Sequence, residues 1–345
     1  MVMYEEIAAK VLESLKAKDS SKGAYPKFSS EDYIPFRIEA KNFHEIKNLD
    51  SKSIAFIDGG NAEIIGSANF SLSMIRASCV VLKKGAKTIR KKSESIVLVS
   101  AIEKNGEIHY KPVVFNRDFL DIEDVSFDSM DETLKNGVNR ADVKSIPNAI
   151  RRFAELNMAK NAADNMLANI IVLDGNLQCT LTNEKKYLDA LYESCEKNNI
   201  VLCALSKTSA LFTDNGNLLS AALSDIAPMK KWDYHPIAEI KSNNHKAEMF
   251  FVKFHEKSNH IFRLEILKAQ KENADEAISN VSSCCNDPVF IGYPFGLIEA
   301  DRIARVSNNE KEFLKTMVLA KIGEKNVAKY LNSSNAHQIL DKISF

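Results

Sequence analysis

Two aspartates stand where buried strands are predicted to end, and each is followed by glycine. Asp58 lies in the run SIAFIDGG, residues 53–60, and Asp174 lies in ANIIVLDGNL, residues 168–177. Each run is apolar and rich in β-branched residues, as is typical of a buried strand. An acid just beyond such a strand faces the edge of an open α/β sheet at which ligands collect. The alternative is that each Asp-Gly pair only forms a turn.

A third acid, Glu155, falls on a predicted helix over residues 146–167, for which Ser145 is a candidate N-cap and Pro147 fits the first turn. At helical spacing Glu155 shares a face with Ala159, Ala162, Ala163 and Met166. This face suits packing on a sheet, so the carboxylate points inward and requires a partner. The partner is either Arg151, one turn earlier, or a metal ion.

A fourth acid, Asp301, lies in the helical pattern YPFGLIEADRIARV. It shares a helix face with Leu297 and Ala304, so we expect it to point toward a packing surface. Glu299 lies off that face, so we expect it to be solvated. The alternative role for Asp301 is an ion pair with a nearby arginine, Arg302 or Arg305.

In chain order the four acids therefore fall on a strand, a helix, a strand and a late helix. Four carboxylates form an all-oxygen set that suits Mg²⁺ or Mn²⁺. Two such ions about 3.5–4 Å apart can stabilise the attacking and the leaving oxygen of a phosphodiester. This order of acids is the arrangement of the ribonuclease-H-like fold, and it predicts phosphodiester hydrolysis with two metal ions.

The predicted elements fit such a fold. Strand patterns over 61–82 and 95–115 follow the first strand directly and indicate an antiparallel meander. After the helix at 146–167 come the strand at 168–177, a helix at 185–199 and a strand that ends at Lys207, an alternation typical of a parallel sheet region. Strand patterns return over 233–268, and helices follow. We predict an α/β chain with a mixed sheet flanked by helices and an additional antiparallel β flank.

Composition excludes several classes of protein. The 345 residues carry 46 basic and 46 acidic side chains, so the chain is neither a wholly basic nor an acidic disordered binder. Glycine is scarce, at 12 residues, which argues against several glycine-rich phosphate loops. The six cysteines show no CxxC spacing, so a zinc site is not expected. No signal peptide or apolar membrane span is apparent, and we expect a cytoplasmic protein.

Five blocks of the sequence resemble, in order, those of the NurA nucleases. The blocks are FIDGG (56–60), IRRFAEL (150–156), VLDGNL (172–177), ALSKTS (204–209) and GYPFGLIEADRIARV (292–306). The resemblance implies a Mn²⁺- or Mg²⁺-dependent deoxyribonuclease, a 5′–3′ exonuclease and single-strand endonuclease. It also implies a homodimer that works with a HerA-type hexameric helicase in resecting DNA double-strand breaks for homologous recombination.

The resemblance also assigns residues. The family's metal carboxylates map onto Asp58, Glu155 and Asp174, and its late block maps onto Tyr293 and Asp301. Many members carry His where this chain has Asp301, which retains metal ligation but cannot donate a proton at neutral pH. Lys207 could stabilise phosphate charge. Tyr293 could hydrogen-bond the DNA backbone or a carboxylate, although it could equally be a packed ring.

Basic residues offer a path for the DNA backbone. The run LKKGAKTIRKK over 82–92 has the charge for phosphate contacts, from Lys83, Lys84, Lys87 and Arg90. Arg151 could also touch phosphate, or it could orient Glu155. Such runs are commonly solvated hairpin tips, which is the alternative. Phenylalanines are expected in the core rather than stacked on bases, namely Phe250, Phe251, Phe254 and Phe262.

We expect three segments. These are an N-terminal helix and loop over residues 1–35, the NurA nuclease domain over 36–320 with a β-rich part near 230–270, and a C-terminal helical segment over 321–345. Two other functions remain possible from the sequence. One is an ATP-binding protein of the actin-like or sugar-kinase type, because IDGG resembles their first phosphate loop. The other is a non-catalytic scaffold that docks a helicase, which the four carboxylates argue against.

Overall fold

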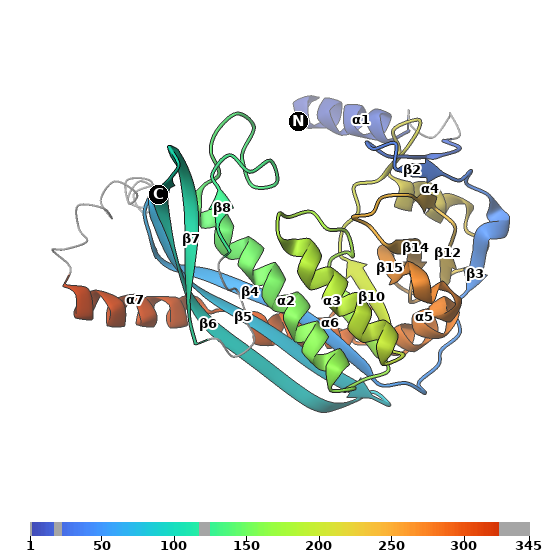
Figure 1. The fold of residues 1–345 in the computed structure, drawn as a ribbon. Coiled ribbons are helices and arrows are strands. Elements are labelled where there is room, and N and C mark those ends of the chain that lie inside the picture. The colour runs from blue at the N-terminus through green and yellow to red at the C-terminus, as the bar shows by residue number, and fades with distance from the viewer. Residues whose placement is uncertain (1, 17–22, 117–124, 324–345) are drawn as a thin grey trace. The chain divides into compact units, whose positions relative to one another are not determined.

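A computed structural model describes residues 2–16, 23–116 and 125–323 of the chain (Figure 1). The described chain forms two compact units. Unit 1 comprises residues 1–52, 174–178 and 201–295, and unit 2 comprises 53–173, 179–200 and 296–345, within the described ranges. The predicted division at residues 35 and 320 stays a prediction, and most of the expected 321–345 segment lies outside the described residues.

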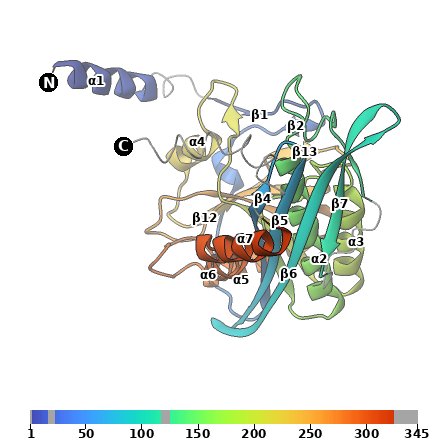
Figure 2. The same cartoon turned by 90° about the vertical axis from the view of Figure 1, so that its left-hand side faces the viewer.

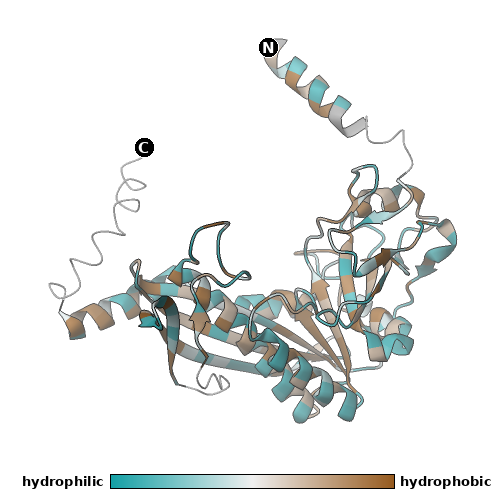
Figure 3. Cartoon of the chain, turned by 45° about the horizontal axis from the view of Figure 1, so that its top comes forward, coloured by the Kyte–Doolittle hydropathy of each residue, from teal (hydrophilic) through white to brown (hydrophobic). Residues whose placement is uncertain are grey.

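Unit 2 is built on a long twisted meander. Its strands lie in the order β9-β4-β5-β6-β7-β8. Their bounds are Ile54–Gly66 (β4), Phe70–Lys83 (β5), Ala86–Lys104 (β6), Glu107–Phe115 (β7), Phe127–Asp128 (β8) and Ile170–Asp174 (β9). Only β9 pairs in parallel with its neighbour β4 among these described strands, so the sheet is mixed. In Figure 3 brown, hydrophobic stretches run along the central strands of the fold.

Helices cover both faces of this sheet. They are α2 (Ile146–Asp164), α3 (Glu184–Lys197), α6 (Phe295–Ala304) and α7 (Asn308–Ile322). Figure 1 shows α2 and α3 lying side by side, and in Figure 2 α6 and α7 cross in front of β5 and β6. A Cβ built on Gly59 would meet Glu155 of α2, whereas one built on Gly60 would meet Ala304 of α6. Because successive residues of a strand point to opposite faces, α2 and α6 lie on opposite faces of β4.

The glycines in β4 correct one prediction. The sequence predicts that the first strand ends in a turn at Asp58-Gly59-Gly60, but β4 continues through these residues to Gly66. The glycines serve close approach of two helices instead of a turn, since a Cβ at Gly60 would lie 2.3 Å from the Ala304 carbonyl oxygen. The second Asp-Gly pair behaves as predicted, because β9 ends at Asp174 and Gly175 has a φ of +114°.

Unit 1 carries the antiparallel flank that the sequence predicts. Its sheet has the order β3-β12-β14-β15-β10. The bounds are Phe43–Glu45 (β3), Val201–Ser206 (β10), Trp232–Tyr234 (β12), Ala247–Lys253 (β14) and Phe262–Leu267 (β15). Two small pairs add β1 (Pro26–Lys27) to β11 (Phe212–Thr213) and β2 (Tyr33–Pro35) to β13 (Ala238–Ile240). The helices are α1 (Val2–Lys16), α4 (Leu219–Ile226) and α5 (Ala274–Ser283), with short 3₁₀ turns at Ala40–Asn42 and Lys268–Asn273 in unit 1 and Val143–Ser145 in unit 2.

Local chemistry explains most element ends and buried positions. Pro147 sits in the first turn of α2 as predicted, but the Ser145 side chain caps nothing there, and Asp142 caps the preceding 3₁₀ turn. All four phenylalanines predicted for the core are buried. Among the described residues, every helix is too short or too polar to span a bilayer.

Candidate active site

Two of the predicted acids follow a parallel strand pair. Strands β4 and β9 pair from Ile54 with Ile170 to Ile57 with Leu173. Asp58 and Asp174 are each the next residue of their strand. The Asp58 side chain is buried and its Oδ1 accepts a hydrogen bond of 2.7 Å from the Gly59 N–H. Strand β4 continues beyond Asp58 to Gly66, whereas β9 ends at Asp174. Both acids directly follow the last residues that pair between the two strands.

The third acid, Glu155, is buried on α2 beside Gly59. Its carboxylate forms an ion pair with Arg151, the partner that the sequence offered as an alternative to a metal, and Arg151 also donates to the Gly59 carbonyl at 3.2 Å. A Cβ on residue 59 would lie 2.5 Å from Glu155 Oε1. Glycine at this position is therefore what lets the carboxylate reach the strand. By strand alternation Asp58 lies on the α6 face of β4, and Glu155 approaches from the α2 face.

A second arginine, Arg152, also pairs with the Glu155 carboxylate. This residue was not predicted for the site from the sequence. Its NH1 lies 3.6 Å from Glu155 Oε2, and its Nε donates to Glu184 at 2.8 Å. Glu184 is almost fully buried. Its Oε1 accepts from Arg152, and its Oε2 accepts hydrogen bonds from the backbone N–H groups of Thr180 and Leu181. We call this set the Arg152–Glu184 clamp. Burial alone would lower the pKa of Arg152, but Glu155 and Glu184 hold that pKa above its ordinary value.

In unit 1 the acid Asp174 pairs with a lysine that the sequence also predicted for the site. Lys207 Nζ lies 2.5 Å from Asp174 Oδ2, and the lysine is roughly half exposed. The same ammonium group lies 5.9 Å from the centre of the Tyr293 ring. Tyr293 is buried and packs against Phe262 and Phe290. The structure thus brings Asp174, Lys207 and Tyr293 together, with Tyr293 also acting as the packed ring considered above.

The prediction for α6 is wrong about which acid is buried. Asp301 is 46% exposed and lies 3.5 Å from Arg305, the ion pair given as its alternative role. Glu299 is the buried acid, and it contacts Lys87, Arg90 at 3.9 Å and Arg302 at 2.9 Å. Burial alone would raise the pKa of Glu299, but Lys87 and Arg302 hold that pKa below its usual range. Two of the predicted DNA-contacting residues, Lys87 and Arg90, therefore face α6.

The other two residues of the basic run lie at the tip of the β5–β6 hairpin. Lys83 ends β5, and Lys84 forms the turn with a φ of +48°. Both are exposed. This matches the hairpin tip that the sequence offered as the alternative to a DNA contact, and it leaves both ammonium groups accessible.

The comparisons with known proteins decide the family. The family model for the NurA domain matches residues 52–306. The chain belongs to the NurA family. It is similar to the solved NurA nuclease from Sulfolobus solfataricus, with 13% identity, a TM-score of 0.54, and coverage of 94% of this chain and 98% of that one. The predicted family and the predicted fold class, a ribonuclease-H-like mixed sheet with flanking helices, are confirmed.

Other solved structures match this NurA chain more weakly. Endonuclease V from Ciona intestinalis, solved with DNA containing an inosine, has 12% identity, a TM-score of 0.36, and coverage of 79% of this chain and 92% of that one. Argonaute from Aquifex aeolicus has 10% identity, a TM-score of 0.35, and coverage of 74% and 28%. No curated protein matches the chain by sequence. Family and fold together support a nuclease.

The predicted NurA acids carry the oxygen donors that a divalent metal prefers. Within the part of the chain that the structure describes, no three His, Cys, Asp or Glu side chains are grouped as a metal site. Instead Glu155 pairs with arginines, Asp174 with Lys207 and Asp301 with Arg305. The donors are nevertheless all carboxylate oxygens, which suit Mn²⁺ or Mg²⁺. The missing Cβ of Gly59 leaves room for Glu155 at the strand. The donor chemistry of these carboxylates therefore suits a divalent cation.

Proposed function

We propose that this NurA chain is a metal-dependent deoxyribonuclease that hydrolyses phosphodiester bonds at DNA ends. The observation that carries the proposal is the register of β4 and β9, because Asp58 and Asp174 directly follow the last paired residues of two parallel strands. Asp174 stands at the carboxyl end of β9, the kind of strand end at which ligands of α/β proteins bind, and β9 pairs with β4 up to the residue before Asp58. The family's solved member from Sulfolobus solfataricus is a nuclease by name, which supports the same activity.

We propose that Asp58, Glu155 and Asp174 hold the metal. Asp58 and Glu155 approach β4 from opposite faces, so they would meet at the edge of β4 where its pairing with β9 ends, after Ile57. The proposed cofactor is a pair of Mn²⁺ or Mg²⁺ ions, and when bound they supply electrophilic stabilisation of the charge that grows on the phosphodiester oxygens. Asp301 stays a prediction of the sequence, and its exposure and its pairing with Arg305 favour a peripheral role. The Arg152–Glu184 clamp would keep Glu155 in one position while the ligand set assembles.

Cations beside the acids would receive the DNA. Lys207 pairs with Asp174, and Arg151 pairs with Glu155. The side chains of Lys207 and Arg151 are 45% and 32% exposed. When a cation binds the carboxylates, these two side chains become available to pair with phosphate oxygens. Lys207 would then stabilise charge next to the scissile bond. Lys83 and Lys84 at the hairpin tip would contact the backbone further away.

The finer predictions rest on the family resemblance. We propose a 5′–3′ exonuclease with single-strand endonuclease activity. We also propose a cytoplasmic homodimer that resects double-strand breaks together with a HerA-type hexameric helicase. The exposed apolar side chains of α1 offer a surface for such a partner, namely Met3, Tyr4, Ile7, Val11 and Leu12.

The test is nuclease activity on end-labelled linear DNA with Mn²⁺, Mg²⁺ or EDTA. We expect metal-dependent degradation by the wild type and its loss in Asp174→Asn. The control is Asp189→Asn, because Asp189 is an acid of α3 whose partner Lys185 lies at the surface. Absence of cleavage with every metal, both alone and with the helicase and ATP, would refute a nuclease and favour the helicase-docking scaffold.

A further inference from the structure

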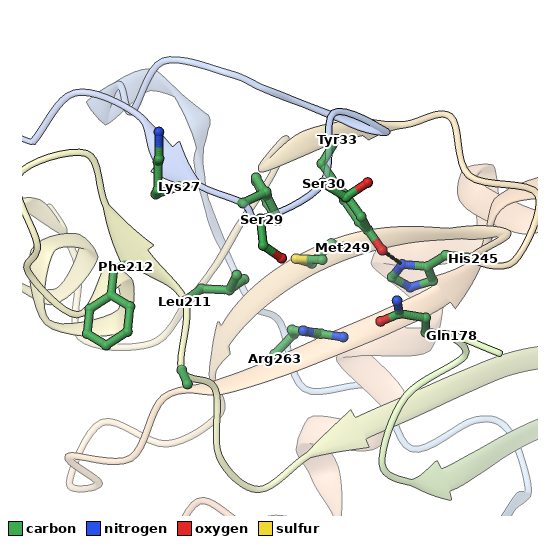
Figure 4. A pocket seen from close by; sticks show the side chains of 12 residues that line it. Lys27, Ser29, Ser30, Tyr33, Gln178, Leu211, Phe212, His245, Met249 and Arg263 are labelled. Carbon is green, nitrogen blue, oxygen red and sulfur yellow. Dashed lines mark hydrogen bonds between the residues drawn. The ribbon is translucent and has the colours of Figure 1, made fainter. Parts of the chain in front are cut away.

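Unit 1 contains a cavity that the proposed chemistry does not use. It has a volume of about 550 Å³, and its lining comes from the segment around β1, the loop before β11, and strands β14 and β15 (Figure 4). Some residues that line the cavity are close in sequence to residues of the proposed site. Gln178, in its lining, is four residues after Asp174, and Ala210 is three residues after Lys207. Arg263, also in its lining, pairs in register with Ser206, the residue before Lys207.

One side of the cavity is polar and rigid. Figure 4 shows the polar ends of Tyr33, His245, Gln178 and Arg263 gathered there. The Tyr33 hydroxyl lies 2.9 Å from His245 Nδ1, and His245 Nε2 lies 3.0 Å from the buried Glu265. The Tyr33 hydroxyl can donate to or accept from Nδ1, according to the tautomer of the ring. Both side chains line the cavity and bring hydrogen-bonding groups to this side of it.

Arg263 belongs to the same network. Its Nε donates to Glu265 Oε1 at 2.8 Å, and the Leu177 N–H donates to Glu265 Oε2 at 2.7 Å. Both oxygens of the buried carboxylate are thus occupied, which fixes the guanidinium plane. The Gln178 carboxamide next to it carries both donors and an acceptor. The polar side therefore presents donors and acceptors at set positions before any ligand arrives.

The opposite side of the cavity is apolar. In Figure 4 Leu211 and Phe212 lie across from the polar group, and Met249 lies between Leu211 and that group, beside Ser29. Phe28 stacks on Tyr33 with ring centres 4.9 Å apart and holds that ring in place. The lining thus combines apolar contact surface with one row of hydrogen-bonding groups. This combination suits a flat ligand that has apolar faces and a polar edge.

We propose that this cavity binds an unpaired nucleobase of the DNA strand that the nuclease cleaves. A nucleobase has apolar faces for Leu211 and Met249, and an edge of donors and acceptors for Gln178 and Arg263. Lys27 at the cavity carries the positive charge that the attached phosphate requires. The proposal rests on the proposed nuclease function, since the cavity starts within four residues of Asp174 along the chain. It adds a base subsite to that function.

The test uses single-stranded oligonucleotides with one 2-aminopurine, placed at successive positions from the end. Binding is measured in EDTA, so no cleavage occurs, and emission rises when the base leaves its stacked neighbours. Two variants target the cavity. Ala210→Trp fills it from an exposed position, and Gln178→Leu removes the polar edge at similar size. The matched control is Ala221→Trp, at an exposed position of α4 outside the lining.

We expect one labelled position to brighten with the wild type and with Ala221→Trp. Both cavity variants should lose that position-specific signal and bind roughly tenfold more weakly, the usual scale for losing one base contact. Unchanged emission and affinity in the cavity variants would overturn the proposal, even when the wild type cleaves DNA with Mn²⁺. The proposed function would fail separately, as absence of cleavage by a wild type that still shows the cavity-dependent signal.

A second arm identifies the source of the base, with free 2-aminopurine deoxyribonucleoside monophosphate as the probe. If the free nucleotide binds as tightly as the oligonucleotide, and binding is lost in Ala210→Trp, the cavity is a site for free nucleotides. The proposal of a subsite for the cleaved strand is then overturned. Much tighter binding of the oligonucleotide supports the subsite.

Discussion

Glu184 is expected to set the position of Glu155 although it does not contact it in the clamp. In Glu184→Gln the size is kept but the charge is lost, so Arg152 loses its 2.8 Å charged partner and retains Glu155 at 3.6 Å. The backbone N–H groups of Thr180 and Leu181 both donate to the same Glu184 oxygen, so both also lose a charged acceptor. Each charged hydrogen bond contributes about 1.5–3 kcal/mol, so we expect unfolding to be easier by about 2–4 kcal/mol.

The same substitution should reduce metal affinity. A buried Arg152 without Glu184 draws the Glu155 carboxylate toward itself and away from the strand. Loss of such a supporting contact lowers metal affinity by about 10–100-fold. The measurements are urea unfolding of the metal-free protein and calorimetric titration with Mn²⁺. Adding Arg152→Met to Glu184→Gln should recover part of the stability, because the buried charge is then gone.

The control substitution is Asp189→Asn on the same helix. Its partner Lys185 lies at 2.7 Å on the protein surface, where an ion pair contributes about 0–1 kcal/mol. We expect this variant to bind Mn²⁺ like the wild type. The reasoning is refuted if folded Glu184→Gln binds Mn²⁺ with wild-type affinity.

Three further outcomes are expected. Gly59→Ala would place a Cβ 2.5 Å from Glu155 Oε1, so cleavage should slow by about tenfold or more, and an unchanged rate would contradict the close approach. Mn²⁺ at about 100 times its Kd should stabilise the protein by about 2.7 kcal/mol in thermal unfolding. The same stabilisation of Asp58→Asn by Mn²⁺ would argue against Asp58 as a metal ligand. Burial alone would raise the pKa of Glu265, but Arg263 and then His245 lower it from 4.5 to about 2. Its stabilising contribution is therefore present above pH 4.5 and lost as the pH falls toward 2, and Glu265→Gln should flatten the acid limb of a stability–pH curve.

The order of elements was predictable because it rests on local patterns. The apolar β-branched runs before Asp58 and Asp174 gave β4 and β9, and the small-residue stripe around Glu155 gave the buried face of α2. The course of β4 beyond Asp58 was not predictable in this way. Gly59 and Gly60 read locally as a turn, and only the approach of a helix from each side makes them strand residues.

The site shows the same limit. On α6 the apolar positions pointed to the face of Asp301, yet Glu299 is the buried acid. Its burial depends on Lys87 and Arg90, which β6 brings from some 200 residues away. The Arg152–Glu184 clamp is similar. The three-residue spacing from Arg152 to Glu155 is a local signal that could have been noticed, but Glu184 reaches Arg152 only through the packing of α3 on α2.

Neither unit is a continuous stretch of chain, and this has a consequence for biosynthesis. Unit 1 needs residues 1–52 together with 201–295, and the Glu39 N–H donates to the Tyr234 hydroxyl across 195 residues. On the ribosome, strand β3 therefore emerges long before β12, the strand with which it pairs. Because the segments of the two units alternate, truncation at any point between residues 53 and 295 removes part of both units. We expect the nascent chain to reach its native state late, after most of its length has left the exit tunnel.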